Sequence, residues 1–266
     1  MTFLAVIVLL AVGFVAAHLA LRPGRAARPF IVSHRGAKGL APENTLMAVR
    51  EAIRRGVAYT EIDIRRTADG VLVVMHDASL RRTTGRDAPV EALTSAEIAT
   101  LVIRTGPGVT PPAEDTVPLF DSILEAIAAS QVTRLVVEVK DPARYPGIAA
   151  QIVAALDRAG ARSKVVVGSF DHAWLPEFHA AAPDVSAFPI ADWWTRVPDA
   201  PPTQMVDYDW LRVLLDPAFV RRMRAQGRQV IVWTVDRPWQ MRLLWWLGVD
   251  GLTTNRPDIA QRVLGD

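Results

Sequence analysis

Side chains that could do acid–base and ionic chemistry occur in four short motifs, each placed at the end of an apolar run. The motifs are His34-Arg35, Glu61-x-Asp63, His76-Asp77 and Glu138-x-Lys140. Side chains two residues apart on a strand share a face, so both members of an x-spaced motif are expected to point the same way. Each motif alone has a structural explanation, since E-x-D is typical of a solvated turn and E-x-K of an ion pair. Their succession favours one shared site, because charged groups turned inward without a ligand are costly to bury.

The carboxylates of Glu61, Asp63 and Glu138 form a candidate ligand set made only of oxygen. The chain contains no cysteine, so no thiolate can bind a metal or act as a nucleophile. Hard cations prefer oxygen ligands, which predicts Ca²⁺ or Mg²⁺ as the cofactor, and Mn²⁺ also fits such a set.

The basic residues and the histidines indicate what the metal would act on. Arg35 and Lys140 supply cationic donors suited to a phosphate. His34 and His76 can take or give a proton near neutral pH. A hard metal, two cations and two histidines describe phosphoryl-ester chemistry better than acyl or glycosyl transfer, and no G-x-S-x-G motif occurs.

These motifs need a scaffold that brings the ends of several strands together. Short apolar and β-branched runs predict strands at 30–33, 59–64, 71–75, 135–139, 164–168, 185–189, 229–235 and 251–254. Amphipathic segments predict helices at 45–55, 147–159, 217–226, 238–247 and 257–264. This alternation predicts an α/β fold, a (β/α)8 TIM barrel over 30–266 in which the carboxyl ends of the strands carry the chemistry. A doubly wound sheet is the rival, but no G-x-G-x-x-G follows the first strand.

Two segments fall outside this alternation. The region at about 79–118 is rich in glycine and proline and is expected to be an insertion between barrel elements. The run at 2–21 carries no formal charge, and about 20 apolar residues are enough for a helix to span a bilayer.

The ends of that apolar run decide between two readings of it. No basic residue precedes it and no convincing cleavage site follows, which favours a transmembrane anchor (1–21) over a cleaved signal peptide and a secreted protein. Arginines in the basic linker at 22–29 then favour a single-pass protein of the cell membrane with a cytoplasmic catalytic domain.

The overall charge limits the partners. The formal net charge is only +2, which does not favour nucleic acid as a partner. The expected partners are a small-molecule substrate and, through the N-terminal helix, the membrane. Nothing in the sequence indicates the oligomeric state.

The order of motifs along the chain resembles the glycerophosphodiester phosphodiesterase family. The resemblance runs from about residue 30 to the C-terminus and rests on HRG (34–36), PENT (42–45), E-x-D (61–63), DG (69–70), HD (76–77), L-x-RTT (80–84), E-x-K (138–140), SF (169–170), W-T-V (233–235) and GVDGLTTNRP (248–257). It implies a TIM barrel with a small insertion after the second βα region. It also implies hydrolysis of glycerophosphodiesters, which are deacylated phospholipids, to sn-glycerol 3-phosphate and an alcohol.

The resemblance implies a role for each matching residue. His34 and His76 match the acid–base histidines, and Glu61, Asp63 and Glu138 match the metal carboxylates. Residues that match phosphate- or substrate-binding positions are Arg35, Lys140, Glu43 and Trp233. One position departs from the pattern, since Asn255 stands where relatives often have aspartate, and the role of that missing charge is open.

Two alternative functions remain at this point. The same site could act on lysophospholipids as a lysophospholipase D. A membrane-tethered binding barrel without catalysis is the alternative of another class, but the intact histidines and carboxylates count against it.

Overall fold

Eight parallel strands close into a barrel within the part of the chain that is described. The structure is a computed structural model that describes residues 3–21, 27–106, 109, 112–197 and 204–265, with side chains from residue 12 onward. The barrel strands are β1 (Phe30–Ser33), β2 (Tyr59–Arg66), β6 (Arg134–Val139), β7 (Val165–Ser169), β8 (Ala187–Ala191), β9 (Met205–Asp209), β10 (Gln229–Trp233) and β11 (Gly251–Thr254). They pair in this order, and β1 pairs with both β2 and β11, so the sheet is closed. The predicted (β/α)8 TIM barrel is confirmed.

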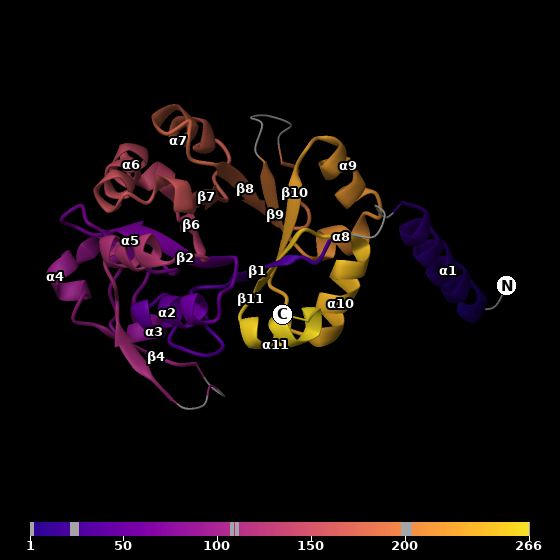
Figure 1. Cartoon of the computed structure of the whole chain (residues 1–266), viewed down its shortest axis with the longest axis horizontal. Coiled ribbons are helices and arrows are strands. Elements are labelled where there is room, and N and C mark those ends of the chain that lie inside the picture. Colours follow the sequence, from indigo (N-terminus) through magenta and orange to yellow (C-terminus); the bar gives the residue numbers. More distant parts are fainter. Residues whose placement is uncertain (1–2, 22–26, 107–108, 110–111, 198–203, 266) are drawn as a thin grey trace.

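Helices surround the barrel on its outside (Figure 1). They are α2 (Leu46–Arg54), α5 (Phe120–Ala129), α6 (Ile148–Ala159), α7 (Leu175–Ala181), α8 (Leu211–Leu215), α9 (Phe219–Ala225), α10 (Pro238–Leu247) and α11 (Pro257–Leu264), with 3-10 turns η2 (Pro142–Arg144) and η3 (Arg162–Lys164). Their apolar faces and the outward side chains of the strands form two large buried clusters. This burial of apolar area holds the strand ends, and therefore the site, in place.

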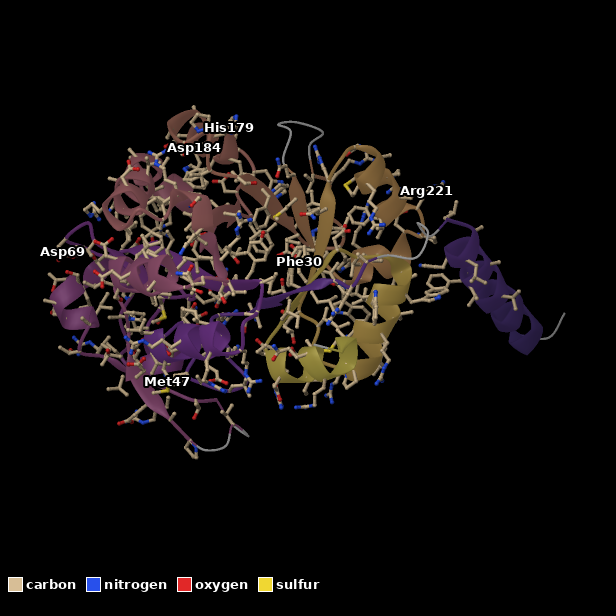
Figure 2. The ribbon with its side chains drawn as sticks, in the orientation of Figure 1. Phe30, Met47, Asp69, His179, Asp184 and Arg221 are labelled. Carbon is tan, nitrogen blue, oxygen red and sulfur yellow. The ribbon has the colours of Figure 1, made fainter. Side chains whose placement is uncertain are left out.

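A separate apolar cluster fills the inside of the barrel. It consists of Val32, Tyr59, Val136, Val166, Phe188, Ile190, Met205 and Ile231. Phe30 packs against it, and Figure 2 shows that residue in the middle of the molecule. The barrel is therefore a packed core, and polar chemistry is restricted to the mouth above it.

Two of the strand predictions need correction. The segment predicted at 71–75 forms β3 (Leu72–Val74), but it pairs antiparallel with the end of β2 and is not a barrel strand. The eighth barrel strand is β9, which the sequence analysis did not predict. Its Met-Val-Asp-Tyr-Asp sequence carries two carboxylates in five residues, which hides the apolar pattern of a buried strand.

The insertion lies between β2 and its helix α5, inside the second β/α unit and not after it as predicted. It contains β3, α3 (Arg81–Thr84), η1 (Val90–Ala92), α4 (Ser95–Ile98), β4 (Val102–Arg104) and β5 (Glu114–Thr116). Buried apolar residues from β3 to Val117 give it a small core of its own. Because β3 turns back along β2, residues that follow β3 return toward the barrel mouth.

The N-terminal segment forms α1 (Phe3–Leu21). The ring of His18 is buried, and its Nε2 lies 3.4 Å from the carbonyl oxygen of Val213 in α8. Among the described residues, no helix combines the length and the apolar character needed to cross a bilayer, so the predicted transmembrane anchor is not confirmed. Most of the predicted linker at 22–29 lies outside the described residues.

Candidate active site

The loop after β1 places His34 and Arg35 at the barrel mouth. Arg35 adopts a left-handed conformation with φ of 50°, and its backbone N–H donates to Glu61 Oε2 at 2.7 Å. Gly36 follows with φ of 82°, and a Cβ there would lie 2.4 Å from the Cβ of Ala48 in α2. The loop can therefore pack against α2 only with glycine at this position, which explains the HRG motif in steric terms.

The predicted metal carboxylates lie together on neighbouring strands. Asp63 on β2 is in register with Glu138 on β6, and Glu61 precedes Asp63 on the same face. One oxygen from each of these three side chains lies within 4.8 Å of the others. All three side chains are buried, and Glu61 Oε1 has no hydrogen-bond partner among the described residues.

The protonation of these carboxyls reflects a negative cluster held in a buried place. Burial and the neighbouring carboxylates raise the pKa of Glu61 well above its usual range. Burial also raises the pKa of Glu138 to about 7, although Lys140 acts against it. Burial opposes ionisation of Asp63 as well, but Lys140 and Arg35 lower its pKa below the usual value. The cluster thus has the ligand type and the unbalanced charge that suit a hard divalent cation.

Arg35 and Lys140 reach the same carboxylates. Lys140 Nζ lies 3.0 Å from Asp63 Oδ1 and also pairs with Glu138. The guanidinium of Arg35 lies 3.6 Å from Asp63 Oδ2, measured from Nε, and donates from Nη1 to Glu43 Oε1 at 2.9 Å. Both cations therefore border the carboxylate cluster, where a bound anion could reach them.

The ring of His34 is oriented by the side-chain amide of Asn255. Asn255 Nδ2 donates to Asp236 Oδ2 at 2.7 Å, and a carboxylate can only accept. Asn255 Oδ1 therefore faces His34 Nδ1, at 2.8 Å, and Nδ1 must be the protonated nitrogen of a neutral ring. Nε2 then carries the lone pair. Burial and the nearby Arg35 lower the pKa of His34 to about 4.

His76 has a charged partner instead. Its Nδ1 lies 2.6 Å from Asp77 Oδ1, and Asp77 Oδ2 accepts from Arg82 Nε at 2.6 Å. Burial lowers the pKa of His76, while Asp63 and Asp77 act in the opposite direction. His76 reaches the site because β3 turns back along β2, so that Met75 N donates to Asp63 O.

Glu43 connects the loop after β1 with the insertion. Its carboxylate accepts from Arg35 and, through both oxygens, from Arg82, and it lies 3.3 Å from Lys38 Nζ. Burial would raise the pKa of Glu43, but hydrogen bonds from Arg82 and the charges of Arg35 and Lys38 lower it to about 2. Glu43 therefore acts on the cavity through Arg35, which it holds in place.

A cavity of about 210 Å³ joins these groups at the barrel mouth. Its lining includes His34, Arg35, Glu61, His76, Glu138, Lys140, Phe170, Asp207, Trp233 and Thr253. Of the nine predicted site residues, seven line this cavity. Asp63 contacts the lining residues from β2, and Glu43 lies behind Arg35. Trp233 and Phe170 meet edge to face with ring centroids 5.7 Å apart.

Sequence reasoning missed two kinds of residue here. Arg82, Phe170 and Asn255 stand in motifs of the family resemblance, but no role was assigned to them. Asp207 lies in none of these motifs, and the strand that carries it was not predicted either. A carboxylate next to apolar residues in 205–209 was the available signal.

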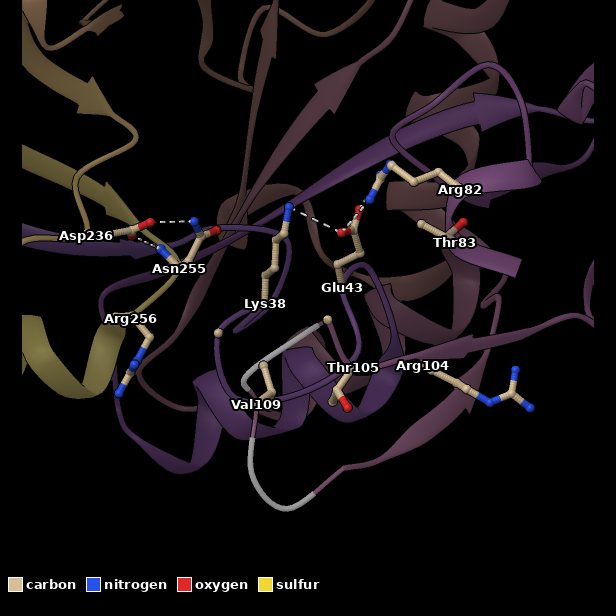
Figure 3. Close-up of a pocket in the computed structure, with 12 residues that line it drawn as sticks. Lys38, Glu43, Arg82, Thr83, Arg104, Thr105, Val109, Asp236, Asn255 and Arg256 are labelled. Carbon is tan, nitrogen blue, oxygen red and sulfur yellow. Dashed lines mark hydrogen bonds and ion pairs between the residues drawn. The ribbon is translucent and has the colours of Figure 1, made fainter. Parts of the chain in front are cut away.

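A larger cavity of about 660 Å³ lies between the loop after β1, the insertion and the loops after β10 and β11 (Figure 3). Lys38, Glu43 and Arg82 meet on one side of it, and Asp236 and Asn255 lie on another. Asn255 and Arg82 are also the residues that contact His34 and the partner of His76. At these points the two cavities are connected by side chains in contact, Asn255 with His34 and Arg82 through Asp77 with His76.

Acid–base groups, cations and an oxygen ligand set meet at the carboxyl ends of the strands of a TIM barrel. This arrangement defines the class of the protein as a TIM-barrel enzyme with a site suited to phosphate esters.

Comparisons with known proteins identify the family. The profile of the Glycerophosphoryl diester phosphodiesterase family matches residues 34–259. A glycerophosphodiester phosphodiesterase from Bacillus subtilis is 30% identical over 258 residues, which cover 89% of this chain and 86% of the relative. One from Bacillus altitudinis is 28% identical over 244 residues, with 88% and 97% covered. A crystal structure from Silicibacter pomeroyi, of a protein assigned as a glycerophosphoryl diester phosphodiesterase, superposes with a TM-score of 0.79 at 28% identity and covers 94% of this chain and 97% of its own. The chain belongs to this family, whose members are phosphoric diester hydrolases.

Proposed function

We propose that the protein is a metal-dependent glycerophosphodiester phosphodiesterase. It would hydrolyse glycerophosphodiesters, the deacylated phospholipids, to sn-glycerol 3-phosphate and an alcohol. The observation that carries the proposal is the shared cavity, into which two histidines, two cations and a carboxylate cluster converge. Membership in the family supports the same reaction.

The carboxylates Glu61, Asp63 and Glu138 would hold the metal. The unpartnered Oε1 of Glu61 and the all-oxygen donor set, both within the described residues, fit Ca²⁺ or Mg²⁺, and Mn²⁺ also suits them. When bound, such an ion polarises a phosphoryl oxygen and offsets charge that develops in the transition state.

Arg35 and Lys140 would bind and orient the phosphate from the two sides of the cluster. Both are partly buried cations whose present ion-pair partners are the cluster carboxylates or Glu43. Glu43 would keep the guanidinium of Arg35 in position, and Trp233 would form one wall of the substrate cavity. Charge-assisted hydrogen bonds of this kind are short and directional, which suits a planar guanidinium at a phosphate.

We infer different steps for the two histidines from their different hydrogen-bond partners. His34 is neutral and presents the lone pair of Nε2, so it would act as the general base that takes a proton from the glycerol 2-hydroxyl. The 2-oxygen attacks phosphorus and forms a cyclic phosphate, while the bond to the alcohol breaks. Burial lowers the pKa of His76, but the Asp77 carboxylate acts against this and stabilises the protonated ring, so His76 would give the proton to the departing alcohol oxygen. Water then opens the cyclic phosphate with the two proton transfers reversed.

The test is release of sn-glycerol 3-phosphate from glycerophosphocholine, glycerophosphoethanolamine and glycerophosphoglycerol. Release should depend on added Ca²⁺, Mg²⁺ or Mn²⁺ and stop with EDTA. Absence of release from all three substrates under every metal condition would overturn the proposed function.

A second candidate activity is that of a lysophospholipase D at the same site. The observation that favours it is the aromatic side of the cavity, where Phe170 is 43% exposed and contacts Trp233. An apolar rim suits a single acyl chain. Choline release from lysophosphatidylcholine and from glycerophosphocholine separates the two activities, because hydrolysis of lysophosphatidylcholine leaves lysophosphatidic acid and not sn-glycerol 3-phosphate. Only lysophosphatidylcholine has an acyl chain that the rim could contact. A binding barrel without catalysis predicts turnover of neither.

Membrane association is a separate proposal, carried by the uncharged run at 2–21 and the arginines that follow it. We place the catalytic domain on the cytoplasmic side, with a cleaved signal peptide and secretion as the alternative. Fractionation of the full chain and of a variant that starts at residue 27 tests it. Recovery of the uncleaved full chain in the soluble fraction would count against an anchor.

A further inference from the structure

Asp207 is a carboxyl of the cavity that the reaction described above does not use. It lies on β9 with its side chain inside the barrel, in register with Ile190 of β8 and Ile231 of β10. Both of these isoleucines belong to the interior apolar cluster. Asp207 is only 7% exposed, and its Oδ1 has no hydrogen-bond partner in the described part of the chain.

Other unpartnered polar atoms line the same cavity. Trp233 Nε1 and Thr253 Oγ1 are buried and, within the residues described, make no hydrogen bond. A buried polar atom left without a partner costs about 1–3 kcal/mol. Together with Arg35 Nε and Glu61 Oε1 of the phosphate and metal site, these atoms are expensive for the folded protein unless ligands supply the partners.

The types of these atoms define that ligand. The indole Nε1–H of Trp233 can only donate, so it needs a ligand atom with a lone pair. Burial raises the pKa of Asp207 well above its usual range, so its carboxyl can donate as well as accept and matches a ligand group that has both a proton and a lone pair. The hydroxyl of Thr253 can do either.

Three common substrate groups can be compared with this set. An ammonium has no lone pair for Trp233, and a quaternary ammonium has neither a proton nor a lone pair. The phosphate of the substrate would already be bound by Arg35, Lys140 and the metal. An alcohol hydroxyl satisfies both, and two adjacent hydroxyls satisfy all three side chains.

We propose that Asp207, together with Trp233 and Thr253, binds the free hydroxyls of the glycerol moiety and selects substrates that carry a vicinal diol. The inference rests on the proposed function and deepens it, because it names the part of the substrate that the enclosed cavity recognises. The variable alcohol then extends out of the barrel. Asp207 is a specificity-determining residue in this account, whereas the histidines and the carboxylate cluster carry the reaction.

The rival explanation is that Asp207 is a fourth ligand of the cation. Among the described residues, the carboxylate oxygens that lie within 4.8 Å of one another belong to Glu61, Asp63 and Glu138, and Asp207 is not in this group. This argues against Asp207 as a metal ligand. If Asp207 were a metal ligand, a change at this residue would weaken the binding of every phosphate ligand equally, since each would bind to the same metal.

The experiment compares two ligands that differ only in the diol. Binding of sn-glycerol 3-phosphate and of n-propyl phosphate is measured by calorimetry to the full chain at one saturating Mg²⁺ concentration. The wild-type protein should bind the diol ligand at least about tenfold more tightly, which corresponds to one good hydrogen bond. In Asp207→Leu this preference should fall to about threefold or less, with the affinity for propyl phosphate unchanged. Asp207→Asn keeps hydrogen-bonding capacity and should retain most of the preference.

Several results would overturn the inference. One is an equal loss of affinity for both ligands in Asp207→Leu. The others are an unchanged preference for sn-glycerol 3-phosphate over n-propyl phosphate in that variant, and no such preference in the wild type. If the leucine variant does not fold, the wild-type preference and the asparagine variant still decide the matter. Failure of the proposed function is seen separately, as absence of glycerophosphodiester turnover in the wild-type protein.

Discussion

Asn255 Oδ1 lies 2.8 Å from His34 Nδ1, and the amide that makes this contact is itself fixed by Asp236. The family resemblance left open what the loss of the charge of the aspartate often found at this position means for the site. The structure shows that a neutral group, the amide of Asn255, makes the hydrogen bond to His34. The negative charge lies on Asp236, which accepts a hydrogen bond from the same amide. The hydrogen bond to Asn255 orients the ring, while burial and the nearby Arg35 keep the pKa of His34 low, so the ring stays neutral as a general base requires.

The contact between Asn255 and His34 predicts a graded loss of activity. Asn255→Leu removes the acceptor and frees the ring to adopt the other tautomer, so kcat should fall about 10- to 100-fold, which is the range for a group that orients a catalytic histidine. Asn255→Asp keeps an acceptor at the same place and should lose much less. Steady-state kinetics on glycerophosphocholine measure both. Equal losses in the two variants would show that the amide acts through packing alone.

His76 is expected to matter far more for turnover than for folding. Its side chain is about one-third exposed, so His76→Ala removes little packing but deletes the proton donor, and kcat should fall about 10²- to 10⁴-fold. The melting temperature should change by only a few degrees. His179→Ala, on the outer helix α7 (Figure 2), is a control that should leave turnover unchanged. Normal turnover in His76→Ala would remove this residue from the mechanism.

The carboxylate cluster predicts metal-linked stability. A ligand at 100 times its dissociation constant stabilises a folded protein by about 2.7 kcal/mol, so Ca²⁺ or Mg²⁺ should raise the melting temperature of the wild-type protein. Glu61→Gln should abolish that rise. Its metal-free form should be at least as stable as the wild type, because one of three mutually repelling carboxyls is removed. Glu125→Gln, which changes an exposed carboxylate of α5, should keep the full metal effect.

Glu43 predicts a pH dependence of stability with a definite sign. Its pKa is lowered from 4.5 to about 2 in the folded protein, so folding favours the ionised form and gains stability from it above about pH 4.5. A shift of this size corresponds to about 3 kcal/mol, which is lost as the pH falls from 4.5 toward 2. Urea unfolding at pH values from 7 to 2.5 should show wild type and Glu43→Gln converging at low pH. Glu51→Gln, which removes a more exposed ion pair on α2, should lie close to wild type throughout. A wild-type to Glu43→Gln difference that is constant with pH would contradict the assignment.

Gly36 predicts a steric effect that can be separated from backbone strain. Gly36 and Gly70 have nearly the same φ, 82° and 81°, but a Cβ at 36 would lie 2.4 Å from Ala48 whereas one at 70 meets nothing within 4 Å. Gly70→Ala should cost about 1–2 kcal/mol, the strain of a left-handed residue alone. Gly36→Ala should cost a further 1–3 kcal/mol of overpacking. Chemical unfolding of both variants measures the difference, and equal costs would mean that α2 moves away freely.

The sequence alone determined the local parts of the site. Side chains two apart on a strand share a face, so E-x-D and E-x-K predicted that Glu61 and Asp63, and Glu138 and Lys140, act together. The contacts of Lys140 with Asp63 and Glu138 agree with this. The alternation of strands and helices predicted the barrel, because each element must bury one apolar face against the next.

Tertiary structure alone decided which segments close the barrel and which groups meet across it. The two carboxylates of β9 conceal the apolar pattern of a buried strand. They are tolerated because Asp207 lines the cavity and Asp209 is the last residue of the strand. His76 was expected at the end of a barrel strand, but it arrives by an antiparallel return along β2. Asp207 and Asn255 lie far in sequence from both histidines, and Arg82 lies 39 residues from Glu43. Only the closure of the barrel and the folding of the insertion bring these groups together. Local patterns report neighbours within one element, whereas a site at the mouth of a barrel is built from contacts between elements.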